Sequence, residues 1–174
     1  GDSSASLVLS GNTLYGTARY GGTSGVGTVF ALNTSGSGFT ILHNFAGYPS
    51  DGSHPVSGLT LSGSTLYGTT ADGGGSFYGT VFRLATDGSD FTLLYSFTAG
   101  NDGALPDAGL TLSGNTLYGT AAYGGAFGYA GYGTVFSLNT DGSDFTILHS
   151  FTHGDDGGQP FATLILSGNT LYGT

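Results

Sequence analysis

The chain repeats itself with a period of about 52 residues, and this periodicity restricts the possible fold more than any other feature. Three motifs recur in a fixed order between copies of Leu-Tyr-Gly-Thr, namely Gly-Thr-Val-Phe, Phe-Thr-Ile/Leu-Leu and Asp-Gly-x-x-Pro. The copies of Leu-Tyr-Gly-Thr are spaced by 52, 51 and 54 residues and occupy 14–17, 66–69, 117–120 and 171–174. Four motifs in a constant order predict tandem copies of one structural unit, each of which buries its faces against its neighbours.

Each copy contains four short runs whose composition is typical of β-strands. In the third copy they are Leu-x-Leu, Thr-Leu-Tyr-Gly-Thr, Thr-Val-Phe-x-Leu and Phe-Thr-Ile-Leu-His-Ser-Phe. The Ser-Gly-Asn segment between the first two runs suits a tight hairpin. Because side chains alternate along a strand, we expect Phe91, Leu93, Tyr95 and Phe97 to share one face. Glycine and β-branched residues interrupt every candidate helix.

Four strands in about 52 residues match the size of a β-propeller blade. We therefore predict an all-β fold, a kelch-like β-propeller built from four-stranded antiparallel blades, with a β-solenoid or an open blade array as alternatives. The prediction is a single domain over 1–174, with repeats at about 7–57, 58–108, 109–162 and a partial repeat at 163–174. This gives about three and a half blades, whereas about four to eight close a propeller. A longer chain, a ring of several chains, or an open end-to-end array would supply the missing neighbours.

The charge balance argues against two classes of partner. The net charge is −9, and Arg19 and Arg83 are the only Lys or Arg residues. Nucleic acids and anionic membrane surfaces are bound by clusters of Lys and Arg, so we expect neither partner. No apolar run reaches the roughly 18 residues that cross a bilayer, so we expect no membrane span. The absence of cysteine excludes disulfides and cysteine-based metal sites.

The internal copies show which polar side chains the repeat requires. His43 and His149 follow the Ile-Leu pair of the last run, and Tyr95 takes the same place in the second copy. A position that accepts either His or Tyr favours aromatic packing or hydrogen bonding over catalysis. An Asp-Gly pair before proline predicts a turn, and nearly identical aspartates lack the distinct environments of a general acid and base. We therefore expect a protein that is not an enzyme.

Aromatic residues in the loops after Leu-Tyr-Gly-Thr are candidate binding residues. Loops on a rigid scaffold often carry binding sites, and aromatic rings suit carbohydrate stacking or protein contact. The alternative is that these rings cover the neighbouring blade. The candidate ligand-binding set is Tyr20, Tyr78, Phe127, Tyr129 and Tyr132.

The turn before the last run carries paired carboxylates. Carboxylates are hard oxygen ligands that suit calcium, although a turn stabilised by backbone hydrogen bonds also accounts for them. No other cofactor is expected. The candidate calcium ligands are Asp87, Asp90, Asp141 and Asp144.

The partial repeat predicts an unpaired hairpin with an open strand edge, which is a template for pairing with another chain. We therefore expect self-association, or contact with neighbouring repeats of a longer chain. The candidate residues of this assembly edge are Leu164, Leu166, Leu171 and Tyr172.

The motif combination resembles the tandem GloVer repeat of Gloeobacter and Verrucomicrobia, and the strand order also resembles a kelch blade. The segments 133–136, 148–151, 156–160 and 171–174 carry the resemblance, which covers nearly the whole chain. It implies a secreted or cell-surface bacterial protein with no established activity. We expect a non-enzymatic extracellular scaffold for protein–protein contact or self-assembly, including a surface or filament structural role. The alternative is a module that binds carbohydrate or another extracellular ligand through loop aromatics and aspartates.

Overall fold

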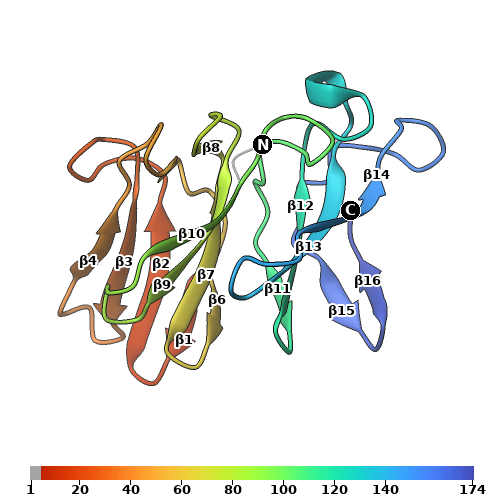
Figure 1. Ribbon diagram of the computed structural model, residues 1–174. Helices are drawn as coiled ribbons and strands as arrows, with labels where there is room; N and C mark the ends of the chain where they lie inside the picture. Colours follow the sequence, from red (N-terminus) through yellow and green to blue (C-terminus); the bar gives the residue numbers. More distant parts are fainter. Residues whose placement is uncertain (1–4) are drawn as a thin grey trace.

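The computed structural model describes residues 5–174 and consists mainly of β-strands and loops (Figure 1). Three four-stranded antiparallel sheets follow one another along the chain, and a two-stranded sheet ends it. Each four-stranded sheet lies within one predicted repeat, and we call these sheets blades 1, 2 and 3. The prediction of an all-β fold made of four-stranded antiparallel blades is therefore confirmed.

The strands occupy equivalent positions in successive blades. Blade 1 consists of β1 (Val8–Ser10), β2 (Thr13–Ala18), β3 (Thr28–Asn33) and β4 (Thr40–Asn44). Blade 2 consists of β6 (Thr60–Ser62), β7 (Thr65–Thr70), β9 (Thr80–Ala85) and β10 (Thr92–Ser96). Blade 3 consists of β11 (Thr111–Ser113), β12 (Thr116–Ala121), β13 (Thr134–Asn139) and β14 (Thr146–Ser150). The terminal hairpin, residues 164–174, contains β15 (Ile165–Ser167) and β16 (Thr170–Tyr172). Two loops pair through β5 (Gly52–Ser53) and β8 (Asp72–Gly73), and η1 (Gly128–Ala130) is a 3₁₀ turn.

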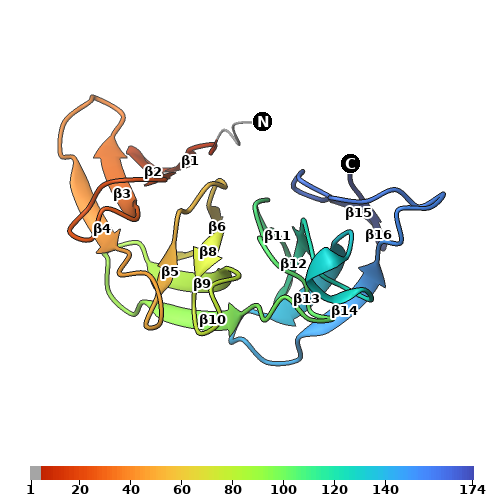
Figure 2. The ribbon, with the colours of Figure 1, turned by 90° about the horizontal axis from the view of Figure 1, so that it is seen from above.

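The blades stand side by side along an arc (Figure 2). The first strands, β1, β6, β11 and β15, line the inner side of the arc, whereas β4, β10 and β14 lie on its outer side. The described residues do not close into a ring, and blade 1 and the terminal hairpin form the two ends. This arrangement is an open array of propeller-type blades.

Glycines allow both the turn and the packing inside a blade. Gly63 lies in the turn between β6 and β7 with φ of +57°, a conformation that strains residues with a Cβ. The pairing of β7 with β9 then sets Gly68 opposite Phe82. A Cβ on Gly68 would lie only 2.6 Å from Cζ of Phe82. The glycine of Leu-Tyr-Gly-Thr therefore makes room for the phenylalanine of Gly-Thr-Val-Phe.

The alternation that the sequence predicted along the outer strand is wrong at one point. Leu93 pairs with Phe82 and Tyr95 pairs with Val81, so Leu94 is an extra residue in a β-bulge. Leu93 packs in the cluster shared with blade 1, whereas Leu94 packs in the cluster shared with blade 3. Equivalent register shifts occur in blades 1 and 3. The bulge lets one outer strand supply side chains to both neighbours, which a regular alternation pattern does not reveal.

Two apolar clusters fill the spaces between the blades. Phe45 and Phe82 meet between blades 1 and 2, and Phe97 and Phe136 meet between blades 2 and 3. All four rings are fully buried, and each such burial stabilises the fold by about 1.5–3 kcal/mol. We call the whole contact between two neighbouring blades a seam, and these two seams connect the blades into one structure.

Candidate functional site

Each seam is closed on its outer side by two stacked aromatic rings. His43 of β4 stacks on Phe91 of blade 2, with ring centroids 3.7 Å apart and planes at 6°. Tyr95 of β10 stacks in the same way on Phe145 of blade 3, at 3.7 Å and 4°. The position that accepts His or Tyr is therefore an aromatic packing site, as comparison of the internal copies predicted.

The aspartate of Asp-Gly-x-x-Pro holds the stacked ring from the loop side. The buried carboxylate of Asp51 lies 2.8 Å from Nε2 of His43 and accepts a hydrogen bond from the Gly52 N–H at 2.6 Å. Asp102 accepts a hydrogen bond from the Tyr95 hydroxyl at 3.2 Å. Burial, together with the nearby Asp102 charge, raises the pKa of Tyr95 to about 12. These aspartates stabilise their own loops, which agrees with the predicted turn.

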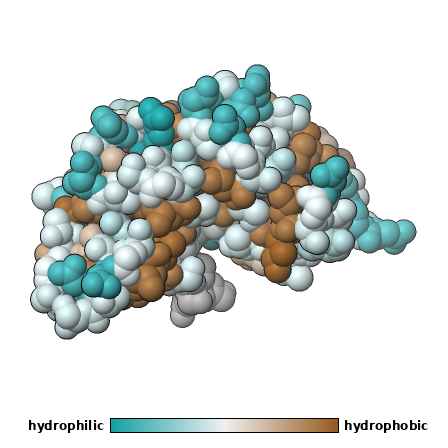
Figure 3. Space-filling model, turned by 90° about the horizontal axis from the view of Figure 1, so that it is seen from below, coloured by the Kyte–Doolittle hydropathy of each residue, from teal (hydrophilic) through white to brown (hydrophobic). Residues whose placement is uncertain are grey.

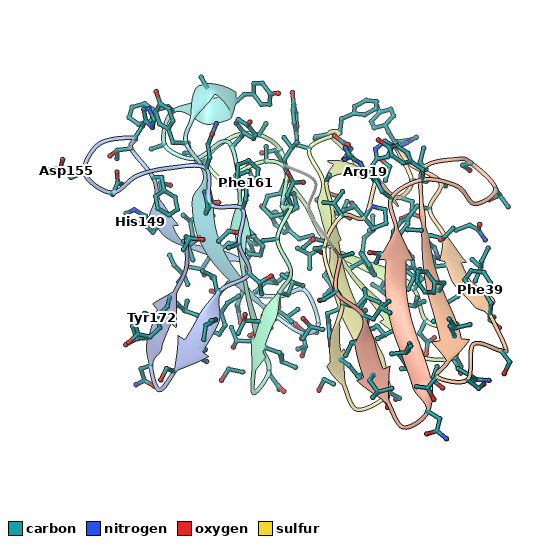
Figure 4. The ribbon with its side chains drawn as sticks, turned by 180° about the vertical axis from the view of Figure 1, so that it is seen from behind. Arg19, Phe39, His149, Asp155, Phe161 and Tyr172 are labelled. Atoms are coloured by element: carbon teal, nitrogen blue, oxygen red, sulfur yellow. The ribbon has the colours of Figure 1, made fainter. Side chains whose placement is uncertain are left out.

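The two ends of the arc expose the two halves of a seam. At one end, blade 1 exposes Leu7, Phe39 and Ile41, whose equivalents in blade 2 pack against blade 1. At the other end, blade 3 exposes Leu148 and His149. Phe39 and His149 lie at opposite ends of the molecule (Figure 4). Apolar surface also borders the open inner side of the arc when it is seen from below (Figure 3).

The terminal hairpin covers part of the last blade face. Leu164 is buried, Leu166 and Leu171 are half-buried, and Tyr172 is exposed. Leu164 and Leu171 line a pocket of about 410 Å³ together with Val135 and Phe151 of blade 3 and the loop after it. The hairpin that the sequence indicated as an assembly edge therefore leaves an apolar hollow beside it. Self-association through these residues stays a prediction.

Four of the five predicted ligand-binding rings form two separate pairs. Tyr78 of blade 2 lies 5.4 Å from Tyr129 of blade 3, measured between ring centroids. Phe127 and Tyr132 lie 6.2 Å apart in an edge-on arrangement within the blade 3 loop. Tyr20 is exposed, as are Phe127 and Tyr129, whereas Tyr78 and Tyr132 are partly buried. These loop rings therefore both cover neighbouring residues and present aromatic surface to solvent.

A polar cluster that the sequence did not reveal lies near Tyr20. Nδ1 of His54 lies 3.0 Å from Oδ2 of Asp72, and the rings of Tyr20 and His54 meet edge-on at 5.3 Å. Burial, together with the nearby Asp72 charge, raises the pKa of Asp107 to about 6 against the opposing effect of Arg19. At the positions of Arg19, His54, Asp72 and Asp107 the copies of the repeat carry different residues, and this variation was the signal that the sequence offered. The folding of the loops brings these side chains together, and the spacing of the motifs does not encode that folding.

Three of the four predicted calcium ligands, Asp87, Asp141 and Asp144, accept hydrogen bonds within their own turns. The Asp87 carboxylate accepts hydrogen bonds from the Ser89 hydroxyl at 2.6 Å and from the Ser89 N–H at 2.9 Å, and these two bonds lower the pKa of Asp87. Asp141 is held in the same way by Ser143, and its pKa is also lowered. Asp144 accepts from the Asn139 amide at 2.7 Å, and the equivalent Asp90 is exposed. Within residues 5–174, no three His, Cys, Asp or Glu side chains are arranged to hold a metal ion. Calcium binding stays a prediction.

Comparison with known proteins assigns the repeat. The sequence profile of the Gloeobacter/Verrucomicrobia repeat matches residues 1–174. The chain belongs to this repeat family. No curated protein is significantly similar to the Gloeobacter/Verrucomicrobia repeat chain in sequence.

Two solved structures resemble the fold of this Gloeobacter/Verrucomicrobia repeat protein. One is a chain in the nidogen/laminin complex, with 17% identity and a TM-score of 0.59, where the match covers 88% of this chain and 48% of that one. The other is a putative TolB from Agrobacterium tumefaciens, with 14% identity and a TM-score of 0.53, where the match covers 88% and 50%. Both are propeller-type folds, and our chain spans about half of their length. In the described part of the chain, no helix is long and apolar enough to cross a membrane.

Proposed function

We propose that this repeat protein is a non-enzymatic extracellular scaffold that makes protein–protein contacts or self-assembles. The observation that carries the proposal is the exposure of aromatic loop residues on the array of blades, such as Phe77, Phe127 and Tyr129. Exposed apolar surface of this kind marks protein-interaction sites. The repeat family and the propeller-like relatives suggest a repeat-protein scaffold.

The arrangement of the repeated polar residues supports a role without catalysis. Asp51 and Asp102 are hydrogen-bonded to the stacked ring of their own blade and to backbone N–H groups of their own loop. A general acid and base need two carboxyl groups in different environments that face one substrate. The repetition of one environment along the array supports scaffold construction instead.

Light scattering and electron microscopy of the purified chain test the proposal. We expect particles whose mass is a multiple of the single chain, in the form of rings or filaments, at micromolar concentration. Raising the salt concentration should favour them, because each chain carries a net charge of −9 and salt screens the repulsion. Monomers alone at all concentrations, together with no binding of any extracellular protein offered as a partner, would refute the scaffold function.

The pair formed by Tyr78 and Tyr129 favours carbohydrate binding as a second candidate function. The two rings come from different blades, and Tyr129 is exposed to solvent. Aromatic faces with few charges nearby suit sugar stacking. We expect Tyr129→Ala to abolish any signal on a glycan array, whereas Phe39→Ser, at the end of the arc, leaves it unchanged. A silent array for the unmodified chain would remove this candidate.

The proposal includes a location outside the cell or on its surface, which the resemblance to GloVer repeats implies. Fractionation of producing cells, with antibodies against the chain, tests this location. Detection only in the cytoplasmic fraction would contradict it.

A further inference from the structure

We infer that a pocket on the inner side of the arc binds a small organic ammonium ion, which the carboxylate of Asp107 holds. The pocket has a volume of about 510 Å³ and is lined by residues 56–60, which lead into β6, and by residues 107–110, which lead into β11. These first strands line the inner side of the arc (Figure 2). A cavity of this size is within the range of small-ligand sites. The inference adds a binding activity that is independent of the proposed scaffold contacts.

The pocket lies where the segments before successive first strands converge. Gly109 donates its N–H to Oγ1 of Thr163 at 3.0 Å. A Cβ on Gly109 would lie 2.9 Å from that Oγ1 atom and 3.4 Å from the carbonyl oxygen of Gly58, so the glycine permits this close approach. Leu59 and Leu110 are buried and form part of the apolar lining. The lining therefore combines apolar side chains with backbone and hydroxyl oxygen atoms.

The blade itself does not require a carboxylate at position 107. Among the described residues, Asp107 is the one titratable side chain that lines the pocket. The residue after the proline of Asp-Gly-x-x-Pro is Val56 in the preceding copy and Phe161 in the following copy. Val56 is buried, so the fold accepts an apolar side chain at this position. The acidic group of Asp107 thus points to a role other than construction of the blade.

The Asp107 carboxyl group is buried without compensation. Its Oδ1 atom is buried and has no hydrogen-bond partner in the described part of the chain. Burial, with the nearby Asp72 charge, raises the pKa of Asp107 to about 6, so the group is mostly ionised at pH 7.5. A buried polar atom without a partner calls for an explanation, and a buried charge is costly unless it is paired.

An ammonium ion supplies the missing partner. Its positive charge and its N–H donors form charge-assisted hydrogen bonds with a carboxylate. The last torsion of an aspartate side chain is soft and nearly twofold, so either oxygen of Asp107 can turn toward the pocket. The apolar lining residues then contact the hydrocarbon part of the ligand.

The charged groups near Asp107 favour a cation over an anion. Asp72 raises the pKa of Asp107 and Arg19 lowers it. Asp72 pairs with His54, at 3.0 Å between Oδ2 and Nδ1, and Cζ of Arg19 lies 5.3 Å from the ring centroid of Tyr20. The ion pairs found within residues 5–174 do not join Arg19 to Asp107. Two carboxylates therefore face one guanidinium, and the net charge of −9 attracts cations to the chain.

The surroundings of Asp107 come from repeats that precede it. Arg19 follows β2 of blade 1, and Asp72 belongs to β8, after β7 of blade 2. Asp107 itself lies between blades 2 and 3. The inner strands of a propeller face a central channel, so further blades beside either end of the arc would leave this pocket in place.

A nuclear magnetic resonance titration of the nitrogen-15-labelled chain tests the site. The probe is cyclohexylammonium chloride, whose ring suits the apolar lining, and its neutral match is cyclohexanol. We expect cyclohexylammonium to shift the amide signals of Gly58 and Gly109, with a Kd in about the millimolar range. Cyclohexanol should bind at least about tenfold more weakly, because it lacks the charge. A constant ionic strength, set with sodium chloride, removes general salt effects.

Asp107→Asn removes the proposed charge and should weaken cyclohexylammonium binding at least about tenfold. Thermal unfolding checks that this variant remains folded. Asp155→Asn removes the same charge from an exposed loop (Figure 4) and is the matched control, which should bind the probe as the unmodified chain does.

Binding should also weaken about tenfold from pH 7.5 to pH 5, since protonation of Asp107, with its pKa of about 6, removes the charge. His54→Gln, which removes the histidine bonded to Asp72, should keep this pH dependence. Equal binding of cyclohexanol, equal binding by Asp107→Asn, or signal shifts confined to residues outside the pocket would overturn the inference. So would the absence of any shift at about 50 mM cyclohexylammonium. These outcomes leave the scaffold function standing, because light scattering tests it separately.

Discussion

Replacing the glycine of Leu-Tyr-Gly-Thr by alanine should destabilise an internal blade far more than the chain end. A Cβ on Gly68 would lie 2.6 Å from Cζ of Phe82 and 2.9 Å from Cδ2 of Leu59. Phe82 is fully buried and Leu59 nearly so, so neither side chain has free space into which to move. Overpacking of this kind costs about 1–3 kcal/mol, and loss of glycine freedom in the unfolded chain returns about 0.4–1 kcal/mol. We expect Gly68→Ala to lower the free energy of unfolding by about 1–2 kcal/mol.

Gly173→Ala is the matched control. A Cβ there would meet only Cδ2 of Leu164, at 2.7 Å, and both residues border the pocket at the chain end. The leucine can move into that space, so we expect a change within about 0.5 kcal/mol. Urea unfolding followed by tyrosine fluorescence measures both variants, and for a slope near 2 kcal/mol/M the Gly68→Ala midpoint should fall by about 0.5–1 M. Equal midpoints for the two variants would refute the argument that the phenylalanine ring dictates this glycine.

Three further predictions concern the polar groups and stacked rings. Asp107 has a pKa raised from 3.8 to about 6, so the stabilisation it gives when protonated is complete below about pH 3.8 and lost as the pH rises through about 6. Asp107→Asn should therefore stabilise the protein at pH 7.5, by about 1–2 kcal/mol after allowance for its partial exposure, and little at pH 3.5; equal thermal shifts at both pH values would contradict this. Asp51→Ala should cost about 2–4 kcal/mol in urea unfolding, because the Gly52 and Ala46 N–H groups lose their buried acceptor, and Asp156→Ala, at an exposed site, should cost less. Tyr95→Ala should cost about 2–3 kcal/mol more than Tyr95→Phe, which keeps the ring stacked on Phe145; similar unfolding midpoints would show that the stack is unimportant.

The blade and its strands could be predicted from sequence because the fold repeats the information three times. In blades 1 to 3, the ends of every run that the sequence indicated as a strand lie within one residue of the ends of an observed strand. For example, β7 (Thr65–Thr70) extends one residue beyond its predicted run. The aromatic packing of His43 was also predictable, since Tyr95 replaces it in the second copy. Comparison of the repeated copies therefore shows which substitutions the fold tolerates at a given position.

Features that depend on one irregular residue could not be predicted in this way. The bulge at Leu94 changes the face of the outer strand, but its sequence is that of an ordinary alternating strand. The cluster of His54, Asp72 and Asp107 joins loops that are far apart in sequence, at positions where each copy differs from the others. The pairing of β5 with β8 involves only two residues from each loop. Short, non-repeating contacts leave no periodic signal.

The chemical equivalence of the two seams has a consequence for how the gene changes. A blade duplicated between blades 2 and 3 would place a Phe91-like ring against Tyr95 and a Tyr95-like ring against Phe145, which are the stacks already present. Unequal recombination between the similar coding segments would therefore lengthen or shorten the array in steps of one blade without creating a mismatched junction. Selection acting on such a gene can adjust the curvature and length of the protein by changing the number of repeats. Point mutations in the exposed loops alter each blade separately.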